Sequence, residues 1–114
     1  MNIISGSLRT LLNILAYNVE RDPCYISLNK ALEAVKSNKL PAAKGFLQQA
    51  KGSIDQKYTS AAYIKNPEYT RIIKDLKASY EGAVQAIQKN DTVSAEKLLE
   101  QSLKSLKDAE KFIK

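Results

Sequence analysis

The chain has 114 residues with one cysteine and no histidine, and 18 Lys and Arg against 12 Asp and Glu give a net charge of +6. This length predicts one helical-bundle domain over residues 1–114, because a second independent core would need more chain. The absence of histidine removes the commonest general base and metal ligand, so we expect no enzyme activity, no metal and no cofactor.

Residues 3–19 are the first predicted helix, with apolar residues on one side at Ile3, Ile4, Leu8, Leu11, Leu12, Leu15 and Val19. Polar residues interrupt the segment, and no apolar run approaches the roughly 20 residues that cross a bilayer. We therefore expect a soluble chain without a leader or a membrane span. One cysteine, Cys24, fits a reducing cytoplasmic setting better than secretion.

Two further helices are predicted in the middle of the chain. Asp22 as N-cap and Pro23 in the first turn begin a short helix that ends near Asn38. Pro41 begins the next helix, and its end between residues 58 and 65 stays open because Thr59, Ser60 and the coming proline weaken the pattern.

The last two predicted helices have the strongest periodicity. Pro67–Lys89 has Asn66 as its N-cap and an apolar stripe that includes Tyr69, Ile72, Ile73, Leu76, Tyr80, Ala83, Val84 and Ile87. Thr92–Ile113 follows, with Asp91 or Thr92 as its cap. The fold class is therefore all-α, an up-down antiparallel bundle of four to five helices joined by short turns.

An internal similarity pairs residues 31–55 with residues 83–107 at an offset of 52. Seven pairs are identical: Ala31/Ala83, Ala34/Ala86, Asn38/Asn90, Ala43/Ala95, Leu47/Leu99, Gln49/Gln101 and Ser53/Ser105. The pattern predicts two helical hairpins with an asparagine at each turn, where Asn tolerates the left-handed conformation. Either internal duplication or the general likeness of Lys-, Ala- and Leu-rich helices explains it. The helix before the second turn should be about eight residues longer than its counterpart.

Four glycines lie singly in the predicted helices, so none builds a phosphate-binding loop. Gly45 and Gly52 are seven apart on one face, which fits either close approach by a partner helix or simple tolerance at exposed positions, and we favour tolerance. Cys24 has no histidine to activate it, so we interpret it as a buried residue rather than a nucleophile.

Basic residues are concentrated between Lys30 and Lys57, a segment with six lysines and two acidic residues. Tyr69 and Tyr80 follow the apolar stripe and are predicted in the core, whereas Tyr58 and Tyr63 lie beside lysines. The candidate binding face consists of Lys36, Lys44, Lys51, Lys57, Tyr58 and Tyr63. A solvated lysine face is the alternative interpretation.

The helix starts resemble those of the cytosolic four-helix immunity proteins that protect lactic bacteria from their own pediocin-like bacteriocins. Asp22-Pro23-Cys24-Tyr25, followed by Leu28, Leu32 and Val35, is similar to the Asp-Pro-x-Tyr helix start of some of these proteins. Asn66-Pro67-Glu68-Tyr69, followed by Ile72, Ile73 and Leu76, is similar to the same start. The resemblance implies a soluble inhibitor of toxin action at a membrane receptor. The hairpins also resemble tetratricopeptide helices, although the offset of 52 differs from that 34-residue repeat.

These patterns predict a non-enzymatic helical interaction module that binds another protein, as a monomer or a homodimer. The alternatives are a basic protein associated with nucleic acid and a bacteriocin-immunity-like protective protein. Arginine forms the bidentate contacts by which proteins recognise phosphates and base edges, and the chain has only three arginines. We therefore rank nucleic-acid binding below protein binding.

Overall fold

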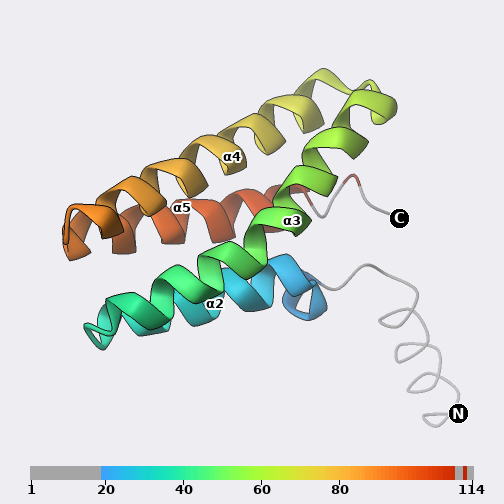
Figure 1. Ribbon diagram of the computed structural model, residues 1–114. Coiled ribbons are helices and arrows are strands. Elements are labelled where there is room, and N and C mark those ends of the chain that lie inside the picture. Colours follow the sequence, from blue (N-terminus) through green and yellow to red (C-terminus); the bar gives the residue numbers. More distant parts are fainter. Residues whose placement is uncertain (1–18, 110–111, 113–114) are drawn as a thin grey trace, which may run out of the picture.

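The computed structural model describes residues 19–109 and residue 112, apart from the side chains of residues 60–64. A 3-10 turn, η1 (Val19–Arg21), precedes four helices (Figure 1): α2 (Pro23–Lys36), α3 (Leu40–Ile64), α4 (Pro67–Gln88) and α5 (Thr92–Ala109). These residues contain no strand, so the all-α prediction is confirmed. The predicted helix over residues 3–19 lies outside the described residues except for Val19.

Side-chain caps begin three of the helices, as their sequences predict. Asp22 Oδ1 accepts a hydrogen bond of 2.7 Å from the backbone N–H of Cys24. Asn66 Oδ1 accepts from the backbone at the start of α4, and Asp91 Oδ1 accepts from Ser94 N–H at 3.0 Å. Asp91 is therefore the cap of α5, and the bond from Ser94 lowers the pKa of its carboxyl group.

The two hairpin turns have the same geometry. Asn38 and Asn90 have left-handed φ angles of 56° and 57°. In each turn the N–H that follows the asparagine donates to the carbonyl five residues earlier, at 2.7 Å in the first turn and 2.8 Å in the second. This is the Schellman arrangement that closes a helix C-terminus. The predicted role of both asparagines is confirmed.

The turn between α3 and α4 settles the open boundary of the third predicted helix. The helix continues to Ile64 and ends at Lys65, whose φ of 55° is also left-handed. The following residue, Asn66, must be extended because it precedes Pro67. The chain therefore changes direction at Lys65, although lysine has no special preference for the left-handed conformation.

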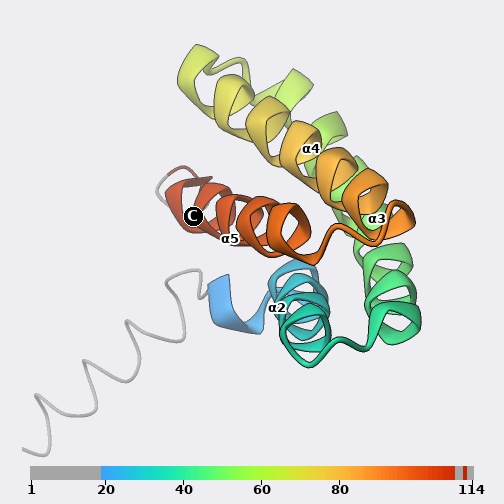
Figure 2. The ribbon, with the colours of Figure 1, turned by 90° about the vertical axis from the view of Figure 1, so that its left-hand side faces the viewer.

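The four helices form a closed up-down arrangement. Each helix packs against the next one in the chain, and α5 returns to pack against α2 (Figures 1 and 2). Helix α4 has 22 residues and α2 has 14, which confirms the predicted difference of about eight. No helix among residues 19–109 is long and apolar enough to cross a membrane.

The two hairpins bury equivalent positions of the internal sequence similarity in the core. Positions related by the offset of 52 are buried in both: Leu28/Tyr80, Ala31/Ala83, Val35/Ile87, Ala43/Ala95, Leu47/Leu99 and Ile54/Leu106. Four of these twelve residues are fully buried alanines, which allow close helix approach. The second hairpin also holds a buried hydrogen bond of 2.7 Å between the hydroxyl groups of Ser79 and Ser102. One of the two hydroxyl groups donates to the other, and the accepting hydroxyl donates its own hydrogen to a backbone carbonyl of its own helix, Leu76 O for Ser79 or Leu98 O for Ser102. Both buried hydroxyl groups therefore have a hydrogen-bond partner.

Candidate functional site

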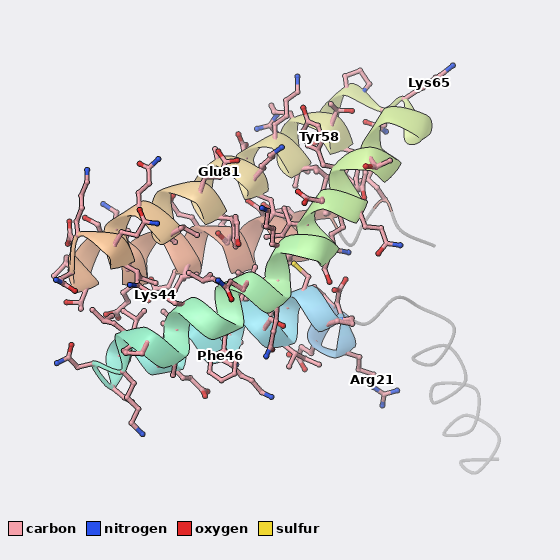
Figure 3. The ribbon with its side chains drawn as sticks, in the orientation of Figure 1. Arg21, Lys44, Phe46, Tyr58, Lys65 and Glu81 are labelled. Atoms are coloured by element: carbon pink, nitrogen blue, oxygen red, sulfur yellow. The ribbon has the colours of Figure 1, made fainter. Side chains whose placement is uncertain are left out.

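A groove of about 580 Å³ lies between the first half of α3 and the second half of α4. It is lined by Lys44, Leu47, Gln48, Lys51, Tyr80, Glu81, Val84, Gln85, Ile87 and Gln88. Because α3 and α4 are antiparallel, these segments share one end of the bundle, and Figure 3 shows Lys44 there. The volume lies within the range of sites that bind small molecules or single side chains of a partner.

The lysines of the groove belong to one flank of α3. The buried stripe of this helix contains Ala43, Leu47, Ala50 and Ile54. Lys44 and Lys51 lie directly beside this stripe, seven residues and two turns apart, and both are exposed. Neither forms an ion pair with any residue that the structure describes. They therefore place two positive charges at the rim of the groove, whose lining also includes one acidic residue, Glu81.

Tyr80 links the two helices at the groove. Its hydroxyl group donates a hydrogen bond of 2.8 Å to the backbone carbonyl of Leu47. The side chain is buried, and this burial raises the pKa of Tyr80 above its ordinary value, with the charge of Asp55 acting in the same direction. Tyr80 is therefore neutral and holds α3 against α4, as expected for a core residue.

Tyr58 lies farther along α3, on the flank that carries Lys44 and Lys51. Its side chain is 39% exposed, and the ammonium group of Lys77 lies 4.5 Å from the centre of its ring. An exposed aromatic ring held beside a cation is a common feature of protein interfaces. The side chain of Tyr63 lies outside the described residues.

Two lysines of the predicted face lie away from the groove. Lys57 Nζ forms a 2.6 Å ion pair with Asp22 Oδ2, and the two side chains are only 15% and 6% exposed. This pair joins α3 to the N-terminus of α2. Lys36 lies exposed in the last turn of α2 and does not line the groove. The structure thus brings together Lys44 and Lys51, with Tyr58 on the same flank, and separates Lys36 and Lys57 from them.

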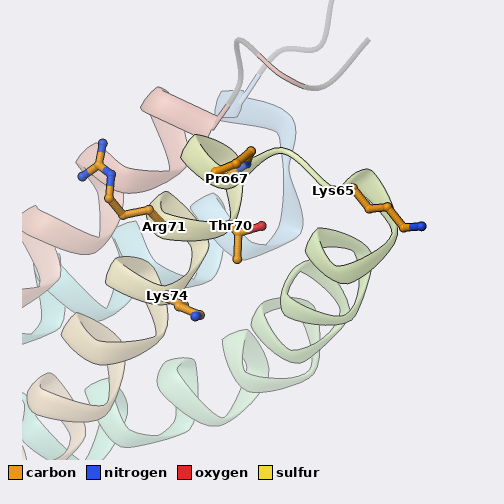
Figure 4. Close-up of a pocket in the computed structure, with 5 residues that line it drawn as sticks. All are labelled: Lys65, Pro67, Thr70, Arg71 and Lys74. Atoms are coloured by element: carbon orange, nitrogen blue, oxygen red, sulfur yellow. The ribbon is translucent and has the colours of Figure 1, made fainter.

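A second, shallower depression of about 520 Å³ lies at the turn between α3 and α4. It is lined by Lys65, Pro67, Thr70, Arg71 and Lys74 (Figure 4). The three basic side chains extend in different directions in this view. Arg71 also lies 3.6 Å from Asp75, an exposed pair of small energetic value. None of these residues is part of the predicted binding face, although Lys65 continues the seven-residue spacing of Lys44, Lys51 and Tyr58.

The glycines of α3 do not mark a close approach within the bundle. A Cβ atom placed on Gly45 or Gly52 meets no atom within 4 Å, which favours tolerance at exposed positions. At Gly82 of α4 the same atom lies 3.1 Å from the Cδ1 atom of Leu98 on α5. Of the three glycines that the structure describes, Gly82 is therefore the one at a close contact between helices.

Cys24 is fully buried at the start of α2, as predicted. The pKa of its thiol is raised to about 12, chiefly by burial and also by the charge of Asp22, while Lys57 acts in the opposite direction. A thiol that is neutral and inaccessible is not a nucleophile. Among the described residues, no group of three or more His, Cys, Asp or Glu side chains could hold a metal ion.

The groove therefore offers charge and apolar contact rather than a reactive group. Both segments that resemble immunity proteins are helix starts in which Asp22 and Asn66 act as N-caps. No family model, curated protein or solved structure matches this chain.

Proposed function

We propose that the chain is a non-enzymatic protein-binding module and that the groove between α3 and α4 receives an acidic segment of its partner. The observation that carries this proposal is the composition of the groove. Lys44 and Lys51 stand at its rim, and the half-buried Val84 offers accessible apolar surface between polar side chains, above the core residues Leu47 and Ile87. Apolar contact inside a charged rim is the usual anatomy of a protein interface.

The amide groups in the lining support the same conclusion. Gln48, Gln85 and Gln88 lie exposed around the groove, and each offers one acceptor and two donor hydrogens. Such groups pair with the backbone of a bound segment as well as with its side chains. The lysines then select acidic segments by charge, mainly through the association rate.

Nucleic acid fits this groove less well, because Glu81 lies in its lining and repels phosphate groups. Among the described residues that line the groove there is no arginine, whose planar guanidinium group pairs best with phosphates and guanine edges. Binding through phosphates would also weaken steeply as salt rises, whereas apolar contacts persist.

The test is affinity capture from a nuclease-treated lysate of the source cell, with low-salt and high-salt washes and identification by mass spectrometry. We expect one protein to remain through the high-salt wash on the unmodified chain. The double variant Lys44→Glu/Lys51→Glu should retain at least about tenfold less of it, since both rim charges are reversed.

Lys97→Glu/Lys104→Glu is the matched control. These two lysines are also exposed and seven residues apart on one helix, α5, so the charge change and spacing are the same. Equal loss with both double variants would show a general charge effect and contradict the proposal. Retention of nucleic acid alone, removed by salt, would contradict it as well.

A further inference from the structure

The basic flank of α3 extends beyond the groove along the whole helix. Lys44, Lys51, Tyr58 and Lys65 follow one another at intervals of seven residues, and all four are exposed. Seven residues are close to two helical turns, so Lys44, Lys51 and Tyr58 share one flank over about 21 Å, with a drift of about 20° per interval. Lys65 follows as the left-handed residue that ends α3, and it lines the depression at the α3–α4 turn. Figure 3 shows Lys44, Tyr58 and Lys65 in that order along α3.

Helix α4 lies next to this flank of α3. Lys77 lies against the ring of Tyr58, midway between the groove and the depression at the α3–α4 turn. Basic side chains outnumber acidic ones in the lining of the two hollows and at this contact, namely Lys44, Lys51, Lys65, Arg71, Lys74 and Lys77 against Glu81. A second acidic residue, the exposed Asp55, lies on the same flank of α3, one turn after Lys51 and one turn before Tyr58. We call this whole surface the α3–α4 track. Six of the chain's 18 Lys and Arg residues therefore lie on this surface.

The seven-residue interval matches a helix better than an extended segment. Two turns of a bound helix also advance about 10.5 Å, so carboxylates on every seventh residue would return to the same side at each basic position. An extended strand advances about 3.3 Å per residue and alternates its side chains, so it does not keep this register.

Glu81 limits the partner further, because it is an exposed carboxylate within a basic track. A continuous polyanion offers nothing to pair with it, and the two charges repel each other. A protein helix provides a basic residue or a hydrogen-bond donor at that point.

We infer that the α3–α4 track binds an amphipathic acidic helix, which spans from the groove at Lys44 to the depression at Lys65. This inference rests on the proposed function and extends its site by about 20 Å beyond Lys51. The bound helix lies along α3 with its carboxylates toward the lysines, its apolar residues over the groove and a basic residue opposite Glu81.

The probe is a synthetic, fluorescently labelled peptide of about 21 residues that is built from seven-residue repeats. Each repeat has one glutamate at the same position and leucines between the glutamates, and one lysine is placed where the bound peptide would meet Glu81. Fluorescence anisotropy should show tighter binding of this peptide than of a version with the same composition in scrambled order. Lys65→Glu/Lys74→Glu should weaken binding about tenfold, while Lys97→Glu/Lys104→Glu should leave it unchanged.

Glu81→Lys separates the protein partner from a polyanion. We expect this variant to bind the peptide more weakly and to bind an oligothymidylate of about 20 nucleotides more tightly. The control variant Glu100→Lys on α5 should change neither affinity. Tighter peptide binding by Glu81→Lys, or preferential binding of the oligonucleotide or of anionic lipid vesicles by the unmodified chain, would overturn the acidic-helix assignment.

The two pairs of lysines distinguish the inference from the function on which it rests. Loss of peptide binding with Lys44→Glu/Lys51→Glu but not with Lys65→Glu/Lys74→Glu would confine the site to the groove and overturn the track. No loss with either pair would contradict the proposed function too. Circular dichroism of each variant confirms that the bundle is folded.

Discussion

Replacing Lys57 with methionine is expected to lower the free energy of unfolding by about 3 kcal/mol. Lys57 and Asp22 are 2.6 Å apart with little exposure, and methionine keeps the length of the side chain while it removes the charge. The variant leaves the Asp22 carboxylate buried beside α3 without this cation. Urea unfolding followed by circular dichroism measures the change.

A double-mutant cycle separates the ion pair from the helix cap. Asp22→Asn keeps an oxygen that accepts from Cys24 N–H but removes the charge, so it should destabilise the chain less than Asp22→Ala. The double variant Asp22→Asn/Lys57→Met should be more stable than the sum of its single changes predicts. Lys51→Met, an exposed control on the same helix, should change stability by less than about 0.5 kcal/mol. A similarly small effect of Lys57→Met would contradict the structural role of the pair.

Alkylation of Cys24 by iodoacetamide is expected to be at least about a thousandfold slower in the folded chain than in denaturant. The thiol is fully buried, and its pKa rises from 9.0 to about 12, chiefly through burial. Each unit of pKa lowers the thiolate fraction about tenfold near pH 8. Reaction therefore requires opening of the bundle, and mass spectrometry at timed intervals measures it.

The same shift sets a dependence of stability on pH. The folded-state pKa of Cys24 is raised, so its contribution is fully present below about pH 9 and is lost as pH rises toward 12. The unfolded thiol ionises first, which favours unfolding over that range. Lys57→Met should also speed alkylation at neutral pH, because it lowers the free energy of opening. Folded and denatured rates within about tenfold of each other would show that Cys24 is accessible.

Local sequence rules account for the helices and their ends. Asp22, Asn66 and Asp91 cap as their side chains predict, and Asn38 and Asn90 end their helices in the left-handed conformation. These features depend on residues within one or two turns, so they are visible without knowledge of helix packing.

Packing between helices decides the remainder of the candidate site. Lys57 follows Ala50 and Ile54 at helical spacing, so it continues the core-facing stripe of α3 and pairs with Asp22, the N-cap of α2, 35 positions earlier. Glu81 and Gln85 line the groove only because their flank of α4 packs beside α3, which the sequence of α4 alone does not show. The interval from Lys44 to Lys65 was visible in the sequence, but a charged stripe becomes a site only beside a second helix.

The most direct test of the account is amide chemical-shift mapping of the isotope-labelled chain as its captured protein partner is added. We predict shifts concentrated along the groove, at Gln48, Lys51 and Gln85, with few on the outer faces of α2 and α5. Shifts centred instead on those outer faces, around Lys30 or Val93, would contradict a partner site between α3 and α4.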